Sequence, residues 1–201
     1  MVSLIKKRLL ALTLALLILL VGCGSAAYGP MRGTWSGNIY TNEYVGITFT
    51  LPDTWIAATD AEIAMLLNVS MDALPVPGAA IPDGAWDELH FYDMLAQSHY
   101  TGSSIIIMYE RLTNEEASLS EREYLELMRE VMEEEMPEYS TFIIADSTTR
   151  IGSDDWYLLT VEYQHGVWQH YFINERGGYI RGILVTIYGQ DSMEDILEMF
   201  S

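Results

Sequence analysis

The chain has 201 residues, half of them apolar and 11% aromatic, a composition that excludes an intrinsically disordered protein. All 29 acidic residues lie after Cys23, together with seven arginines and no lysine, so that part has a formal net charge of −22 (7 − 29). Phosphate backbones repel such a surface, which excludes nucleic acid as a partner. Because Cys23 is the single cysteine, no disulfide can form within the chain.

The N-terminus has the pattern of an export signal. A basic segment at residues 6–8 precedes an apolar run of 13 residues at 9–21, which is too short for a comfortable transmembrane helix. The run ends at residues 20–23 in Leu-Val-Gly-Cys, which resembles the lipobox of bacterial lipoproteins. The resemblance implies diacylglycerol on Cys23 and cleavage just before it. It leaves no free thiol for catalysis or metal binding.

We therefore expect a signal peptide at residues 1–22 and a mature protein bound to the membrane through lipidated Cys23. Two acyl chains anchor a protein stably, whereas a single chain holds only marginally. The expected location is the outer face of the bacterial cytoplasmic membrane, or the periplasm or outer membrane if the cell has one. An ordinary secreted protein and an uncut signal anchor are the alternatives.

A flexible tether is predicted for residues 23–37, followed by a single domain over residues 38–201. The segment from Gly24 to Gly37 is rich in Gly, Ser and Ala and has no apolar period. Trp35 either docks on the domain or is exposed.

The first strands of the domain carry its most informative motif. Strands are expected at residues 39–41 and 47–51, the second with alternating apolar residues and threonines. The pattern is Tyr44-x-Gly46-apolar-x-Phe49-x-Leu51-Pro52-x-x-Trp55. It resembles the first hairpin of PsbP/Mog1-like domains, particularly those in small bacterial lipoproteins. The order of the remaining elements agrees with this resemblance, which spans roughly residue 38 to the C-terminus.

The next segments alternate between a helix, a loop and two strands. Thr59 or Asp60 can cap a helix through residue 67. Three prolines and two glycines between residues 72 and 84 predict a long loop. A strand is expected at residues 86–96, with His90, Tyr92 and Met94 on one face and Leu89, Phe91 and Leu95 on the other. Residues 104–109 are apolar on both faces, which is typical of a central strand.

The clearest helix begins at Ser120, which forms a capping box with Glu123, and ends before Pro137. Its apolar residues recur at helical spacing. Its opposite face is acidic, and includes the like-charged pairs Glu126/Glu130 and Glu130/Glu134. This face is either a solvated helix surface or a surface that binds a cation or a partner.

The C-terminal third reads as a β-meander followed by a short helix. Strands are expected at residues 141–145, 148–151, 156–164, 167–174 and 179–188, with a helix through residues 192–200 capped by Ser192. Short turns between strands, with helices near the start, middle and end, predict an α+β fold with a mostly antiparallel sheet and packed helices. The PsbP/Mog1-like resemblance implies an α/β/α arrangement.

No catalytic, cofactor-binding or metal-binding residue is assigned. Nucleophile elbows, Ser-x-x-Lys, phosphate loops, His-Glu-x-x-His and calcium loops are all absent. His165 and His170 could converge with an acid on a metal, or be ordinary surface histidines like His90 and His99. Turn carboxylates occur at Asp154, Asp155 and Asp191. Nine aromatics could line a groove or pack across the sheet: Trp86, Phe91, Tyr92, Trp156, Tyr157, Tyr163, Trp168, Tyr171 and Tyr179.

The expected function is that of a lipid-anchored, non-catalytic module that binds an envelope protein or a small ligand. PsbP/Mog1-like domains are mostly accessory modules, and this resemblance adds weight to the expectation. An envelope hydrolase and a cation-binding lipoprotein are the alternatives. A pocket with two acids would favour the hydrolase, and an apolar patch rimmed by acids would favour the binding module.

Overall fold

The computed structural model describes residues 29–68, 70–71, 74, 76–79, 90–163 and 166–201. The expected signal peptide, Cys23, the first part of the tether and His165 therefore lie outside the described residues, as does most of the expected loop at 72–84. Trp86 and the start of the strand expected at residues 86–96 lie outside them too.

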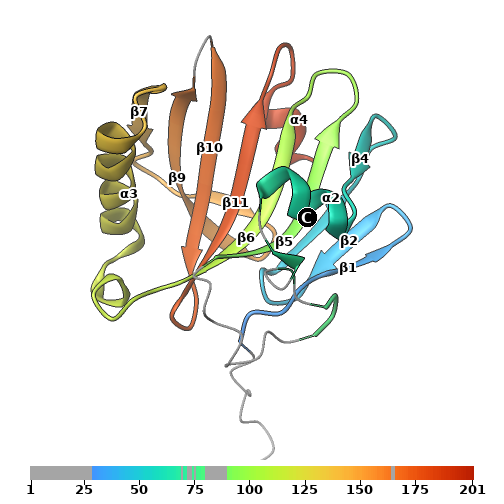
Figure 1. The fold of residues 1–201 in the computed structure, drawn as a ribbon, viewed down its shortest axis with the longest axis horizontal. Coiled ribbons are helices and arrows are strands. Elements are labelled where there is room, and N and C mark those ends of the chain that lie inside the picture. The colour runs from blue at the N-terminus through green and yellow to red at the C-terminus, as the bar shows by residue number, and fades with distance from the viewer. Residues whose placement is uncertain (1–28, 69, 72–73, 75, 80–89, 164–165) are drawn as a thin grey trace, which may run out of the picture.

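Two antiparallel sheets make up most of the described chain (Figure 1). The small sheet has the order β1-β2-β3, formed by Thr34–Ser36, Ile39–Asn42 and Ile47–Thr50. The large sheet has the order β4-β5-β6-β11-β10-β9-β7, and β8 pairs with β9. Its strands are β4 (Trp55–Ala57), β5 (His90–Ser98), β6 (Ser104–Arg111), β7 (Tyr139–Ile144), β8 (Thr149–Ile151), β9 (Asp154–Tyr163), β10 (Val167–Glu175) and β11 (Tyr179–Ile187).

One face of the large sheet packs against the small sheet and against α4 (Met193–Leu197). The main core lies between them, where Phe49, Ile107 and Trp156 are fully buried. The C-terminal residues also pair with β3, because the Thr48 and Thr50 amides donate to the carbonyls of Ser201 and Met199, both at 2.8 Å. The two ends of the domain thus meet in the small sheet.

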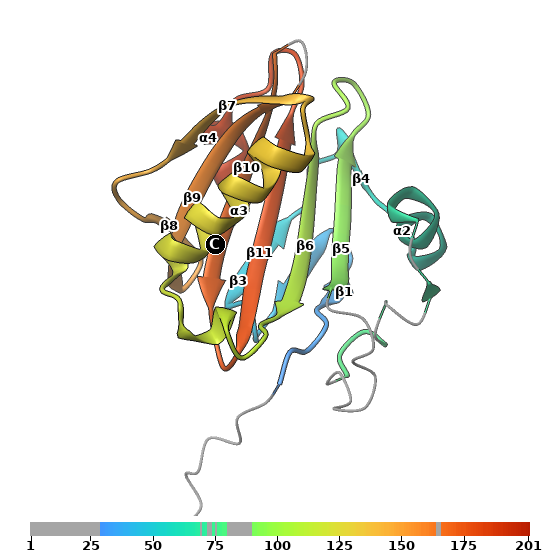
Figure 2. The ribbon, with the colours of Figure 1, turned by 60° about the vertical axis from the view of Figure 1, so that its left-hand side comes forward.

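The other face of the large sheet carries two helices at opposite sides (Figure 2). The helix α3 (Glu121–Glu135) packs on β7, β9 and β10, around the buried side chain of Leu125. The shorter α2 (Asp60–Leu67) lies beside β5 and buries Ile63. Between the two helices, β11 and β6 run across the middle of the sheet.

The helix starts follow the capping residues found in the sequence. Ser120 and Glu123 form the expected capping box at α3, and Thr59 and Glu62 form one at α2. Ser192 caps α4, which ends at Leu197 and is shorter than predicted. Each predicted strand is present within the described residues, and the α+β class with a mostly antiparallel sheet is confirmed.

The tether predicted for residues 23–37 extends too far into the domain. Residues 34–36 form β1, and Arg32 is buried with 6% exposure. Trp35 contacts Tyr40 and Phe49, with ring centroids 5.3 and 6.2 Å away. The Gly- and Ser-rich composition of this segment predicted a flexible chain. The segment is ordered because it forms hydrogen bonds with strands far away in the sequence.

The facing of β5 also differs from the prediction. The register against β6 shifts between Tyr92 and Met94, so a β-bulge interrupts the alternation at Asp93. Phe91 and Met94 consequently face the small sheet, whereas Tyr92 and Leu95 face α2. Strict alternation predicts Tyr92 and Met94 on the same face of the strand. The extra residue in the bulge moves the side chains after it to the opposite face.

Candidate functional site: an apolar groove between the helices

The candidate site is the strip of sheet between α3 and α2 that no described helix covers. Along β6, Ile105, Ile107 and Tyr109 are buried under the small sheet, whereas Ile106 and Met108 on the opposite face are only partly buried. Register pairs Ile106 with Leu184 and Met108 with Gly182 on β11. Met108 and Leu184 are therefore partly accessible on this face, whereas Ile106 packs against the cluster of Ile63 and Leu95 beside α2.

A groove of about 420 Å³ lies over this strip. Its wall is the side of α3, and its floor is formed by β6, β10 and β11. The lining is mainly apolar, with Met108, Leu127, Met128, Val131, Ile180 and Leu184 among its residues. Gly182 belongs to the floor, where an added Cβ would lie 3.1 Å from the Met108 side chain. Glycine thus leaves room for Met108 to lie across the floor.

Polar groups gather at one end of the groove. His90 Nε2 lies 3.3 Å from Glu110 Oε2, and the Tyr124 hydroxyl donates to the same oxygen at 2.6 Å. Glu116 also lines the groove there, and its carboxylate accepts from the Thr113 amide at 2.8 Å. The groove therefore has an apolar body and a polar end with two carboxylates.

The ionisation of these groups follows from their contacts. The hydrogen bond with Glu110 raises the pKa of His90 above its ordinary value, against an opposing effect of burial. Burial would raise the pKa of Glu110, but hydrogen bonds with His90 and Tyr124 outweigh it, and the net pKa is lowered. Burial beside this carboxylate raises the pKa of Tyr124. Glu110 is thus held ionised, the wrong state for a general acid at neutral pH.

The volume and lining of the groove fall within the range found for ligand pockets. Ligand pockets span about 300–1,000 Å³ and are mostly apolar, with a few polar groups that orient the ligand. Methionines are flexible and polarisable, and Met108, Met128, Met132 and Met136 all line this groove. Such a surface can adapt to apolar groups of different shapes.

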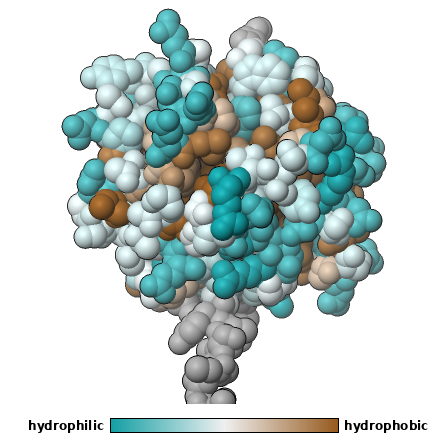
Figure 3. All heavy atoms as spheres, turned by 180° about the vertical axis from the view of Figure 1, so that it is seen from behind, coloured by the Kyte–Doolittle hydropathy of each residue, from teal (hydrophilic) through white to brown (hydrophobic). Residues whose placement is uncertain are grey.

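Exposed apolar side chains by themselves would not have singled out this region. The face seen from behind, in Figure 3, also shows hydrophobic areas among hydrophilic ones. Exposed apolar residues are scattered over the described chain, including Ile56 on β4 and Ile143 on β7. What distinguishes the groove is that its apolar residues from α3 and three strands surround one hollow.

His165 lies outside the described residues, and the described histidines and turn carboxylates considered from the sequence are not brought together. Burial lowers the pKa of His170 to about 4, and its Nδ1 lies 2.9 Å from the Thr160 hydroxyl. Asp154 pairs with Arg181 at 2.9 Å, and the exposed Asp155 pairs with Arg150 at 3.4 Å. Asp191 accepts from the Thr101 hydroxyl, and His99 is exposed. Within the described residues, no group of three or more His, Cys, Asp or Glu side chains could hold a metal ion.

Of the nine aromatics considered from the sequence, Trp86 lies outside the described residues, two are buried in the core, and Tyr92, Tyr157 and Tyr171 are partly buried against it. Phe91 and Trp156 are fully buried, and Tyr139 and Tyr163 pack across neighbouring strands with centroids 5.2 Å apart. Tyr171 lines the groove, together with Tyr124 of α3.

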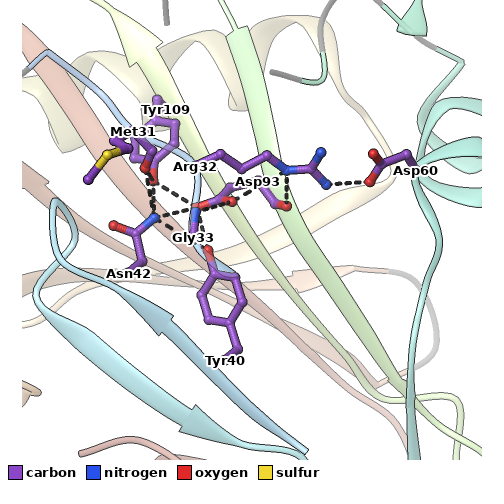
Figure 4. Close-up of polar contacts among 8 residues, drawn as sticks. All are labelled: Met31, Arg32, Gly33, Tyr40, Asn42, Asp60, Asp93 and Tyr109. Carbon is purple, nitrogen blue, oxygen red and sulfur yellow. Dashed lines mark hydrogen bonds and ion pairs between the residues drawn. The ribbon is translucent and has the colours of Figure 1, made fainter. Parts of the chain in front are cut away.

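A buried polar cluster, which sequence reasoning missed, joins the N-terminal segment to the large sheet (Figure 4). At its centre is Asp93, 2% exposed, which the β5 bulge turns toward the small sheet. Its Oδ2 accepts from the Tyr40 hydroxyl, from Tyr109 at 2.8 Å and from Asn42 at 2.6 Å. Its Oδ1 accepts from the Gly33 amide at 3.0 Å.

Arg32 completes this cluster. Its Nε donates to the Asp93 carbonyl at 2.9 Å, and its guanidinium reaches Asp60 of α2 at 2.5 Å. Burial raises the pKa of Asp93, although the hydrogen bonds and the Arg32 charge oppose the shift. These contacts join different chain segments, and none of the described residues that make them is in the groove lining, so the cluster holds the N-terminal segment, α2 and β5 together.

Arg181 forms a second buried contact between the sheets. It is 2% exposed and donates to the carbonyls of Tyr44 and Val45 at 3.0 and 3.1 Å. Asp154 balances its charge, and its guanidinium lies 5.3 Å from the centroid of the Trp156 ring. The turn before β3 is thereby held on β9 and β11.

The described residues thus form a mostly antiparallel α+β domain with an apolar groove on one face of the large sheet. No family model matches the chain. No curated protein matches its sequence. Among solved structures, it is similar to the solution structure of cyanobacterial PsbP (CyanoP) from Synechocystis sp. PCC 6803, with 12% identity and a TM-score of 0.44. The match covers 89% of this chain and 96% of that chain. In the described part of the chain, no helix is long and apolar enough to cross a membrane.

Proposed function

We propose that this protein is a lipid-anchored envelope protein whose domain is a non-catalytic binding module with the groove as its binding site. The observation that carries the proposal is the apolar hollow of about 420 Å³ over β6 and β11. The groove has the two acids that would favour a hydrolase, Glu110 and Glu116. Glu110 is already engaged by His90 and Tyr124, and Glu116 accepts from the Thr113 amide. No Ser, Thr, Cys or Lys is among the described residues of the lining.

Anchoring through Cys23 and export to the bacterial envelope belong to the same proposal, and both rest on the lipobox. A PsbP/Mog1-like relationship, with its α/β/α layering, rests on the motif from Tyr44 to Trp55.

Replacement of the lipidated residue tests the anchor. We expect Cys23→Ala to release the protein from the membrane fraction, because the thioether to diacylglycerol can no longer form. Fractionation followed by immunoblotting measures the distribution, and circular dichroism of the released protein checks that the domain is folded. Unchanged membrane retention of the variant would contradict the lipoprotein assignment.

Photolabelling tests the groove. Full-length protein in a non-ionic detergent is irradiated with a neutral fatty alcohol that carries a diazirine, and the labelled residues are mapped by mass spectrometry. We expect labels on α3 and on β6 and β11 around Leu127, Val131 and Met108, since these side chains line the hollow. Val131→Asp places a charge in the groove and should reduce labelling about tenfold, equivalent to about 1.4 kcal/mol.

The matched control is Ile143→Asp, which makes the same kind of change on β7, outside the groove lining. Ile143 is 53% exposed and Val131 44%, so both variants should fold. Labels spread evenly over exposed apolar residues, or equal loss in both variants, would contradict a specific site.

A further inference from the structure

The uncovered strip has the width of one α-helix. It consists of β6 and β11, which pair from Thr186–Ser104 to Tyr179–Arg111. Neighbouring strands lie about 4.8 Å apart, so two strands present about 10 Å, which is the diameter of a helix with its side chains. On the same face, α3 contacts β7, β9 and β10, and α2 contacts β5. A further helix between them would complete a helical layer over this face.

The wall of the groove presents the apolar spacing that a helix would contact. Leu127 and Val131 are one turn apart on α3, line the groove and are 39% and 44% exposed. The floor adds Met108 and Leu184, which are partly exposed. An apolar stripe at i, i+3/i+4 and i+7 on a docked helix would meet both surfaces and remove them from water.

The two flanks of α3 differ in charge. On the flank toward β7, Arg122 pairs with Glu126 and Arg129 pairs with Glu133, both at 3.6 Å, and Arg122 also donates to the Ala145 carbonyl. Acids and bases thus largely neutralise one another along that flank.

The flank toward the groove is acidic. Helical spacing places the exposed Glu130 and Glu134 beside Leu127 and Val131, at the outer rim of the groove and not in its lining, and neither acid forms an ion pair among the described residues. Glu110 and Glu116 lie at the polar end, and neither lysine nor arginine lines the groove. An occupant with positive charges on either side of an apolar stripe would complement this border.

We propose that the groove receives a basic amphipathic helix of a partner protein. The apolar stripe of that helix packs on Met108, Leu184 and Val131, and its Lys or Arg side chains lie beside Glu130 and Glu134. This inference rests on the proposed function, because it takes the groove to be a binding site and names the chemistry of its occupant.

The test uses a probe of defined sequence. A synthetic peptide of Leu and Lys at helical spacing, with one photo-leucine in its apolar stripe, is cross-linked to the full-length protein in non-ionic detergent. Mass spectrometry then maps the cross-links. We expect them on α3, β6 and β11 at the groove, and we expect a Leu/Glu peptide of the same spacing to give none.

Two double variants with the same change in charge separate the groove flank from general attraction to an acidic protein. Glu130→Gln with Glu134→Gln should weaken cross-linking about tenfold, since about 0.7 kcal/mol for each of two ion pairs amounts to that factor. Glu126→Gln with Glu133→Gln, on the arginine-paired flank, should leave it unchanged. Equal loss in both, or cross-links outside the groove, would overturn the proposal.

The neutral diazirine alcohol distinguishes failure of this inference from failure of the proposed function. If the alcohol labels the groove but the Leu/Lys peptide does not, the groove binds an apolar ligand and the basic helix is wrong. If neither probe labels the groove, the proposed function fails as well.

Discussion

At the scale of single residues, the most constrained group is the carboxylate of Asp93. It is buried and accepts hydrogen bonds from two tyrosines, one asparagine and one backbone amide. All of these groups are donors, so the site requires a side chain that only accepts. Gly33 is constrained for a related reason, because an added Cβ would lie 2.3 Å from the Tyr40 ring.

Asp93→Asn should therefore destabilise the protein although it preserves the side-chain volume. One oxygen becomes an NH₂ group that faces a group that can only donate, either the Gly33 amide or the Asn42 side-chain amide. We expect a loss of about 2–4 kcal/mol in the free energy of unfolding. Urea denaturation followed by circular dichroism measures it.

Asp60→Asn is the control for Asp93→Asn, because it also removes a carboxylate that contacts Arg32. The Asp60 side chain is 40% exposed, so water can replace the lost contact and the change should cost far less. Equal losses in the two variants would show that the buried cluster is no more important than a surface ion pair.

At the scale of elements, the turns decide how the two sheets meet. Gly46, before β3, and Gly152, between β8 and β9, lie back to back, and the Ser153 amide donates to the Gly46 carbonyl at 3.0 Å. Both glycines have positive φ, 77° and 58°. A Cβ on Gly152 would lie 2.3 Å from the Gly46 carbonyl oxygen, which is backbone and cannot move aside alone.

Gly152→Ala should consequently lower the free energy of unfolding by more than the strain of its left-handed backbone conformation alone. Gly177 is the matched comparison, since its φ is 65° and a Cβ there would have open space. We expect Gly177→Ala to cost about 1–2 kcal/mol, the ordinary penalty of the left-handed region. Gly152→Ala should lose at least twice as much free energy of unfolding, measured by thermal or urea denaturation. Equal losses in the two variants would mean that the two turns can move apart without destabilising the protein.

At the scale of the whole molecule, the N-terminal segment belongs to the domain. Arg32 and Gly33 reach across to β5, β1 extends the small sheet, and the C-terminal residues 199–201 pair with β3 at its other edge. Both ends of the described chain thus stabilise the same small sheet. Breaking either end should expose the main core beneath it.

Truncation tests this boundary. A chain that begins at Asn38 loses Arg32, Gly33 and β1, and leaves the Asp93 carboxylate with fewer donors and no nearby positive charge. We expect it to unfold at a lower temperature and to lose about 3–5 kcal/mol relative to a chain that begins at Gly29. Calorimetry of both forms measures the difference. Equal stability would show that residues 29–37 do not contribute to the folded domain and belong to the tether.

The local elements were predictable because their causes are local. Helix caps at Thr59, Ser120 and Ser192, the stop before Pro137 and the alternation along residues 47–51 depend on neighbours within a few positions, and each gave the expected element. Apolar residues on both faces of residues 104–109 likewise identified this segment as part of a central strand.

The candidate site depended on contacts between residues far apart in sequence. The groove exists because the strand order places β6 beside β11 and because α3 and α2 cover other strands, and neither fact follows from a periodic pattern. The Asp93 cluster likewise joins residues 53 and 60 positions apart through a bulge that periodicity did not reveal. Local chemistry determined most of the elements, whereas the tertiary structure placed β1 in a sheet and decided which faces the described elements cover.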